Sequence, residues 1–170
     1  YPLRRQRQMC IRDSYIAEQY TVRRVWPDGT ITTVAGLWRG GSDEDGIPAL
    51  EAEIRPQDIA VANDGTLYIA ERWNHRVRRV SPDGIITTFA GVGRMPNRGE
   101  PVGDGAPATE SLLDEPHDIA VGPDGSIYIA DTWNQRIRKV GTDGVISTVA
   151  GTGYWGYPTE GGIATEENIG

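Results

Sequence analysis

The sequence predicts an all-β protein built from repeated four-stranded antiparallel sheets, and three observations lead to this prediction. Residues 57–91 and 117–151 align without a gap at an offset of 60, and 20 of the 35 positions are identical. Each copy holds four short apolar stretches that are rich in Ile, Val, Thr and Tyr, residues that favour strands. A Gly or Pro interrupts every stretch after about six residues at most, which excludes long helices.

Turn residues divide each copy into its expected strands. In the first full copy these strands are Asp58–Ala62, Leu67–Ala70, Arg76–Val80 and Ile85–Ala90. An Asp-Gly pair separates the first strand from the second and the third from the fourth, and glycine accepts the positive φ that a tight hairpin requires. The pairs are Asp64-Gly65, Asp83-Gly84, Asp124-Gly125 and Asp143-Gly144. Each repeat is therefore expected to form an antiparallel meander.

The first two strands of the repeat are apolar on both faces. Because side chains alternate along a strand, Ile59 and Val61 point one way and Ala60 and Ala62 the other. This pattern favours a sheet packed between two similar sheets over a two-sheet sandwich, in which one face meets water. The third strand alternates less cleanly and is expected nearer the rim. Four-stranded sheets stacked face to face form a β-propeller, and the chain is expected to supply about two and a half blades of an incomplete ring.

The repeats divide the chain into four parts. Residues 15–50 hold a partial blade and its connection, residues 51–110 one blade, and residues 111–170 another blade with the connection that follows it. Residues 1–14 differ in composition and contain the single cysteine. The stretch from Met9 resembles a translated sequencing adapter, so we interpret this segment as non-native and disordered, at the end of a metagenomic gene fragment. A short basic arm and a degraded signal peptide are the alternatives. The natural protein is accordingly expected to be longer, with its targeting signal missing here.

Charge and composition narrow the classes of partner. The formal net charge is −7, and an acidic chain is repelled by phosphate backbones and anionic lipid. Nucleic-acid binding is therefore disfavoured, and no apolar run of the roughly eighteen residues needed to cross a membrane is present. The single cysteine, Cys10, excludes an internal disulfide and any metal site made of several cysteines.

The long connections between repeats carry the first candidate binding residues. Each contains an acidic residue followed by glycine, at Asp45, Asp104 and Glu160, and an alanine three residues after that glycine. Equivalent connections are expected on one face of a propeller, where these carboxylates would bind Ca²⁺, a cationic partner or a sugar. Calcium takes about six to eight oxygen ligands, and one carboxylate per blade does not supply them. We therefore expect no cofactor, with Ca²⁺ as the alternative, and a turn-stabilising role for the carboxylates is the competing interpretation.

Two further residue types recur at equivalent positions in the two full copies. Trp73 and Trp133 are expected to pack on their hairpins or, where exposed, to anchor a partner. Arg78 and Arg138 are expected either to pair with Glu71 and Asp131 across the hairpin or to face a partner. These four residues are the candidate partner-binding residues of the blades.

The innermost strand offers a weak candidate for a metal or catalytic site. His117 and Asp118 stand at its start, and a ligand or base at this place would face the axis of a propeller. Gln57 replaces the histidine in the preceding copy, so the histidine is not repeated. No Ser-His-Asp order, phosphate-binding glycine loop or His-Glu-x-x-His string appears, and the sequence assigns no catalytic residue.

The repeat resembles the NHL repeat, especially its long bacterial and teneurin-like form. The resemblance rests on the pattern DIAV-x-x-DG-x-[IL]YIA-[DE]-x-x-N-x-R-[IV]-R-x-V and covers residues 15–170. Asn74-His75-Arg76 and Asn134-Gln135-Arg136 match the segment for which the family is named. The chain departs from the pattern at Gln135, which replaces the histidine, and in its first copy, which is shortened and lacks the Trp-Asn pair.

The resemblance implies an interaction scaffold of the six-bladed-propeller kind that binds a protein or a carbohydrate, often outside the cell or at the bacterial envelope. Whether the protein is an enzyme stays open, with the balance against it. One alternative is part of a metal-dependent lactonase-like or lyase-like propeller, whose other blades hold most of the ligands. The other is an RNA-binding NHL module, which the acidic charge disfavours.

Overall fold

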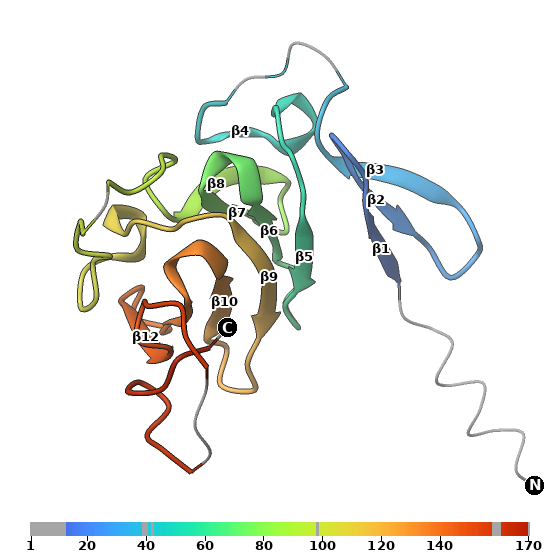
Figure 1. The fold of residues 1–170 in the computed structure, drawn as a ribbon. Helices are drawn as coiled ribbons and strands as arrows, with labels where there is room; N and C mark the ends of the chain where they lie inside the picture. Colours follow the sequence, from blue (N-terminus) through green and yellow to red (C-terminus); the bar gives the residue numbers. More distant parts are fainter. Residues whose placement is uncertain (1–12, 39–40, 42, 98, 158–160, 170) are drawn as a thin grey trace, which may run out of the picture.

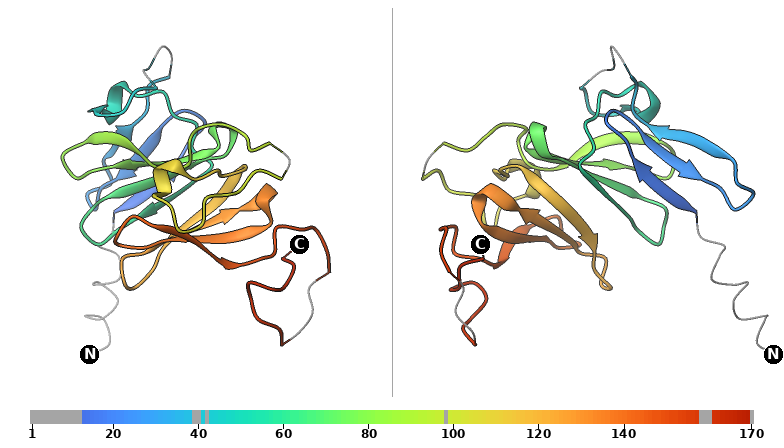
Figure 2. Two further views of the ribbon diagram at one scale, coloured as in Figure 1. Left: turned by 90° about the vertical axis from the view of Figure 1, so that its left-hand side faces the viewer. Right: turned by 45° about the vertical axis from the view of Figure 1, so that its right-hand side comes forward.

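The computed structural model describes residues 13–38, 41, 43–97, 99–157 and 161–169. Within these residues the chain forms three antiparallel sheets that follow one another in space in the order of the sequence (Figure 1; Figure 2). Neighbouring strands of each meander are also neighbours along the chain, as the Asp-Gly turns predict. The described helical segments are short 3₁₀ turns, and none is long and apolar enough to cross a membrane. The all-β, antiparallel prediction is confirmed.

The strands begin and end close to their predicted positions. The first sheet contains β1 (Ser14–Ala17), β2 (Val22–Val25) and β3 (Ile31–Ala35). The middle sheet contains β4 (Ile47–Pro48), β5 (Asp58–Val61), β6 (Leu67–Glu71), β7 (Arg76–Val80) and β8 (Ile85–Ala90). The last sheet contains β9 (Pro116–Val121), β10 (Ile127–Asp131), β11 (Arg136–Val140) and β12 (Ile146–Ala150). In the middle sheet, β5 and β6 differ from the predicted strands by one residue each, and β7 and β8 match them.

The middle sheet has a fifth strand that the repeat does not predict. β4 belongs to the connection before the blade and pairs with the outer strand β8, with Ile47 opposite Ile86 and Pro48 opposite Ile85. In the last sheet a single bridge between Pro107 and Val145 takes the same place. An outer strand presents unpaired backbone groups along its edge, and pairing with the connection satisfies part of that edge.

The first strand begins inside the segment interpreted as non-native. Ser14 is the first residue of β1, where it lies opposite Val25 of β2. Asp13 forms an ion pair with Arg24, also on β2. Both residues therefore pack with the first sheet, whereas the predicted disorder of residues 1–12 lies outside the described residues.

Apolar side chains cover both faces of the middle sheet. Toward the first sheet, Leu67, Ile69, Val80 and Ile86 pack with Val22 and Ala35. Toward the last sheet, a face of small residues, Ala70, Val77 and Ala90, meets the larger side chains of Ile119, Ile127, Ile129 and Ile146. Burying one such isoleucine contributes about 1.5–3 kcal/mol. The prediction that each blade is covered on both sides by copies of itself is confirmed for this blade.

Each connection returns to the blade through the same backbone hydrogen bond. The N–H of the glycine that ends a blade donates to the carbonyl of the alanine that recurs in the connection. The bonds join Gly36 to Ala49, Gly91 to Ala108 and Gly151 to Ala164, at 2.8, 2.9 and 2.9 Å. Ala49 and Ala108 are buried, which explains why a small residue recurs at this position in the connections.

Candidate binding face

One end of the sheets gathers the long connections and the second hairpin of each blade. Because antiparallel strands alternate in direction, the turn between the second and third strands lies at the same end as the connection to the next blade, and the Asp-Gly turns lie at the other. In the middle and last sheets this second turn is a 3₁₀ segment, η2 (Arg72–Asn74) and η4 (Thr132–Asn134). We call the end formed by η2, η4 and the described parts of the connections 91–115 and 151–169 the connection face.

Trp73 and Trp133 project from these two turns, and their side chains are 60% and 62% exposed. Each turn ends in a residue with left-handed backbone, His75 at φ 49° and Gln135 at φ 50°. The side chain of the intervening asparagine closes the turn: Asn74 Nδ2 donates to Glu71 at 3.1 Å. In the last blade Asn134 Nδ2 donates the equivalent bond to Asp131. Both indoles therefore project from turns with the same asparagine–carboxylate hydrogen bond.

A buried carboxylate under each turn ties three segments together. In the last blade Asp131 is fully buried and accepts hydrogen bonds from Asn134 Nδ2 at 2.9 Å and from the backbone N–H of Asp114 at 2.7 Å. The Arg138 guanidinium, also fully buried, lies 3.2 Å from the same carboxylate. Asp131 and Asn134 therefore hold the turn of the last blade. In the middle blade the buried carboxylate is Glu71, which accepts the N–H of Arg55 at 2.8 Å. Its ion-pair partner there is Arg76, at 2.6 Å, and the expected pair of Glu71 with Arg78 does not form, because Arg78 lies 3.0 Å from Asp45.

The predicted carboxylates of the connections bind the blade that follows them. Asp45 accepts the N–H of Thr88 at 2.7 Å and lies 3.0 Å from Arg78. Asp104 accepts a hydrogen bond from the hydroxyl of Thr148 at 2.8 Å and lies 2.8 Å from Arg138. Both carboxylates keep about half of their side-chain surface exposed, 51% and 47%, so partner binding by these oxygens stays a prediction. Glu160 lies outside the described residues.

The alternative in which Arg78 and Arg138 face a partner is wrong for this structure. Both side chains have 0% exposure, because each shares a sheet face with the isoleucine opposite it, Ile69 or Ile129, and the incoming connection covers that face. Polar and apolar residues alternate poorly along the third strand because one of its buried residues is an arginine, which pairs with a carboxylate of the connection. These two guanidinium groups stabilise the fold.

The axial candidates His117 and Asp118 lie on β9. Asp58, the counterpart of Asp118 in the middle blade, accepts the N–H of Ile119 at 2.9 Å and so joins the inner strands of two sheets. Among the residues that the structure describes, no group of three or more His, Cys, Asp or Glu side chains is arranged to hold a metal ion. A metal at His117 and Asp118 stays a prediction.

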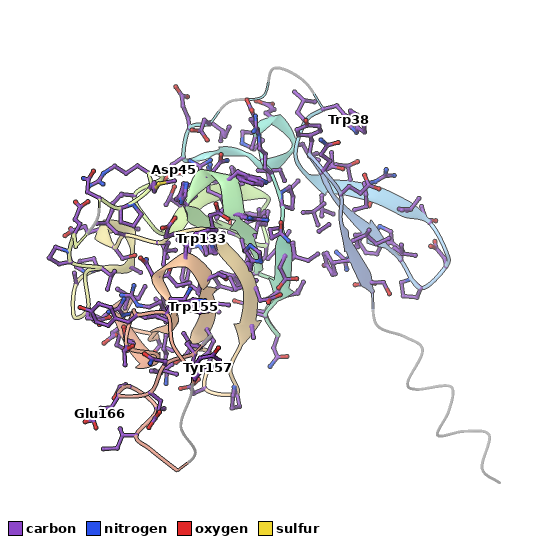
Figure 3. The ribbon with its side chains drawn as sticks, viewed as in Figure 1. Trp38, Asp45, Trp133, Trp155, Tyr157 and Glu166 are labelled. Carbon is purple, nitrogen blue, oxygen red and sulfur yellow. The ribbon has the colours of Figure 1, made fainter. Side chains whose placement is uncertain are left out.

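Aromatic residues of the last connection belong to the site and were not predicted. Tyr154, Trp155 and Tyr157 are all more than three-quarters exposed. Trp155 and Trp133 lie near one another at the last sheet and line a hollow of about 530 Å³ (Figure 3). The signal was present in the run Tyr154-Trp155-Gly156-Tyr157, because the chain holds five Trp, seven Tyr and a single Phe.

A charged loop borders the connection face beside η4. Arg94 donates to both oxygens of Glu100 at 3.0 and 2.7 Å, and the N–H of Asn97 donates to the same carboxylate at 2.8 Å. The bonds from Arg94, followed by the backbone bond from Asn97, lower the pKa of Glu100 from 4.5 to about 2. Glu100 is therefore ionised throughout the neutral range and holds the loop closed.

We expect the order of this loop to depend on pH in the direction set by a lowered carboxyl pKa. The bonds to Glu100 are fully present above its ordinary pKa of 4.5, and they are lost as the pH falls through about 2. A carboxyl NMR titration should give a midpoint near 2 for Glu100, and Arg94→Ala should move it toward 4.5. A wild-type midpoint near 4.5 would contradict the ion pair in solution.

Comparisons with known proteins agree with the repeat and the fold. The family model for the teneurin NHL domain matches residues 85–156, and that for the NHL repeat matches residues 54–80. The chain is 30% identical over 167 residues to Teneurin-m of Drosophila melanogaster, a match that covers 90% of this chain and 6% of that protein. It is 36% identical over 91 residues to mouse Teneurin-1, which covers 48% of this chain and 3% of the relative.

A solved structure of a protein of unknown function from Bacteroides thetaiotaomicron is similar with a TM-score of 0.62 and 26% identity. The match covers 75% of this chain and 32% of that one. The chain thus spans a small part of the teneurins and about a third of this structure. The repeat pattern, the stacked antiparallel sheets and these matches agree, and the chain belongs to the NHL-repeat family of β-propeller proteins.

Proposed function

We propose that the chain is part of a non-enzymatic NHL propeller that binds a protein or carbohydrate partner through its connection face. The observation that carries the proposal is the pair Trp73 and Trp133. They occupy equivalent turns in consecutive blades, and most of each indole is exposed. Tryptophan is enriched among the residues that dominate binding energy at interfaces, and an exposed pair on one face is a natural anchor.

The rigidity of the two turns supports this proposal. Binding costs free energy when side chains and loops must be ordered, and a side chain on a preordered turn avoids part of that cost. The turns are preordered by buried carboxylates, with Asn134 Nδ2 bonded to Asp131 at 2.9 Å in the last blade. The guanidinium of Arg72 lies 4.3 Å from the centre of the Trp73 ring and restrains that indole further.

The burial of the repeated arginines argues against the RNA alternative. RNA-binding modules present a basic face and bases stack on exposed aromatic or arginine side chains. Arg78 and Arg138 are fully buried and paired with carboxylates, so these two recurring arginines do not contribute to such a face. The enzymatic alternative needs several ligands that converge on the axis, whereas partner binding through the connection face needs none.

We expect the double variant Trp73→Ala/Trp133→Ala to lose binding while it keeps the fold. Phage-displayed peptides and an oligosaccharide array, both probed with the 170-residue chain, supply the test ligands. Most ligands selected against the wild-type chain should weaken by about tenfold or more, as expected when a hot-spot side chain is truncated. An unchanged melting temperature of the double variant would show that the loss of binding comes from the missing indoles and not from unfolding.

Trp26 provides the matched control. It lies in the turn between β2 and β3, at the opposite end of the sheets, and its side chain is 37% exposed. Trp26→Ala should leave ligand affinities unchanged. If the selected ligands depend on Trp26 and tolerate loss of the other two indoles, the binding face is the opposite one and the proposal fails.

A further inference from the structure

A hollow with a volume of about 800 Å³ lies on the connection face beside η4. The loop of Asn97 and Glu100 forms one wall, and the segment of Gly153 and Tyr154 forms another. Trp133 and Tyr154 contribute aromatic rings to the lining, 62% and 76% exposed, and Asn134 and Arg136 contribute polar side chains. Its volume lies in the range of about 300–1,000 Å³ that small-molecule sites occupy.

Three carboxylates, those of Glu100, Asp104 and Asp114, and one cation, Arg136, line this hollow. Glu100 pairs with Arg94 at 2.7 Å, and Asp104 pairs with Arg138 at 2.8 Å. The two terminal N–H groups of Arg136 donate hydrogen bonds to backbone carbonyls, Nη1 to that of Asn134 at 3.0 Å and Nη2 to that of Thr152 at 2.8 Å. An anionic ligand would meet three carboxylates and a single cation in this lining, and a cationic ligand would have to compete with Arg94 or Arg138 for a carboxylate. Either case costs free energy.

A ligand with hydroxyl groups meets no such cost. A carboxylate that accepts bonds from one guanidinium keeps further lone pairs, since its two oxygens offer about four acceptor sites. Asp104 accepts bonds from Arg138 and Thr148 and is 47% exposed, so hydroxyl donors can reach its remaining lone pairs from the hollow. The Glu100 carboxylate, in contrast, already accepts four bonds from Arg94 and Asn97. The polar part of the lining therefore suits a neutral, polyhydroxylated ligand.

The two rings supply the apolar part of the site. The pyranose ring of a sugar has a face of C–H groups and a rim of hydroxyls. An aromatic ring can bury the C–H face, while nearby polar side chains bind the hydroxyls. Trp133 stands on a rigid turn closed by Asn134, so this ring is preorganised. Tyr154 is held at its backbone, where its N–H donates to Thr152 Oγ1 at 3.2 Å.

The preceding blade does not repeat this combination. Counting from the glycine that ends each blade, Gly91 and Gly151, Arg94 occupies the position of Tyr154. In addition, Trp73 has the Arg72 guanidinium beside its ring at 4.3 Å, whereas Thr132 replaces that arginine before Trp133. The hollow at Trp133 and Tyr154 is therefore a particular site and not a by-product of the repeat.

From these contacts we propose that the hollow between Trp133 and Tyr154 is a binding site for a neutral oligosaccharide. The inference rests on the proposed function, because it places one class of partner on the connection face. The two rings bury the C–H faces of the sugar. The side-chain oxygens of Asp104 and Asn134 accept its hydroxyl protons.

Isothermal titration calorimetry of the 170-residue chain tests this site with the hexaoses of cellulose, xylan, starch, chitin and laminarin. At least one neutral hexaose should bind with a Kd below about 1 mM. Trp133→Ala and Tyr154→Ala should each weaken that binding about tenfold, whereas Tyr154→Phe, which keeps the ring, should lose about threefold or less. Trp26→Ala, at the opposite end of the sheets, should leave the Kd unchanged.

Two results would overturn the oligosaccharide site. The first is no measurable heat with any neutral hexaose at about 10 mM, a concentration well above the affinities of specific binding. The second is hexagalacturonic acid, the acidic comparison, binding as tightly as the best neutral ligand. If no sugar binds and peptide ligands still require Trp73 and Trp133, this inference fails and the proposed function stands; if neither class of ligand depends on the indoles, both fail.

Discussion

Gly91→Ala is expected to destabilise the protein by about 3–5 kcal/mol, a large part of the stability of a domain of this size. Two costs add at this position. The glycine has φ +87°, a conformation that costs an L-residue about 1–2 kcal/mol. A Cβ atom there would also lie 2.6 Å from the carbonyl oxygen of His75 and 2.9 Å from the Cα atom of Arg76, both backbone atoms that cannot move aside.

Gly84→Ala separates the two costs. Gly84 has nearly the same φ, +83°, but nothing lies within 4 Å of the Cβ position. This variant should lose only the conformational cost of about 1–2 kcal/mol. Urea unfolding of both variants, followed by circular dichroism, measures the difference. Equal losses would show that the turn at Gly91 relaxes and that the close approach of the two segments contributes nothing.

The second large effect is expected at Asp131. Asp131→Ala should cost about 2–4 kcal/mol, because the buried Arg138 guanidinium loses its buried partner and is left with Asp104, a carboxylate that is about half exposed. The Arg138 side chain is fully buried, and the N–H of Asp114 loses its acceptor at 2.7 Å as well. Asp131 also accepts the Asn134 bond that closes the Trp133 turn. Binding at the connection face should therefore weaken together with stability.

A double-mutant cycle with Arg138→Met isolates the ion pair. The double variant should lose at least about 1 kcal/mol less than the sum of the two single variants, since neither charge is then left alone in the interior. Glu110→Ala, at an exposed carboxylate of the same region, should stay within about 0.5 kcal/mol of the wild type. Strict additivity at Asp131 and Arg138 would mean that the two groups do not interact in solution.

The candidate site was only partly predictable. The recurrence of Trp73 and Trp133 singled out these two residues as candidates, but a sequence does not say whether an indole packs on its hairpin or stands in solvent. Exposure followed from the turn, in which the left-handed residue and the asparagine–carboxylate bond hold the backbone away from the sheet. The hollow at Tyr154 needed two connections about fifty residues apart to meet, and no local pattern encodes such a meeting.

The blades themselves were determined by the sequence alone. Alternating apolar residues, Asp-Gly turns and the offset of 60 are local or repeated signals, so β7 and β8 begin and end at their predicted residues. Only the tertiary structure decided which charged residues are buried and which groups they pair with. From the sequence, Arg138 on β11 was expected either to pair with Asp131 or to face a partner. Its second partner in the structure, Asp104, lies 34 positions earlier in an irregular connection. Such a pair forms because the connection folds over the sheet and excludes water there, and that burial depends on packing between distant segments.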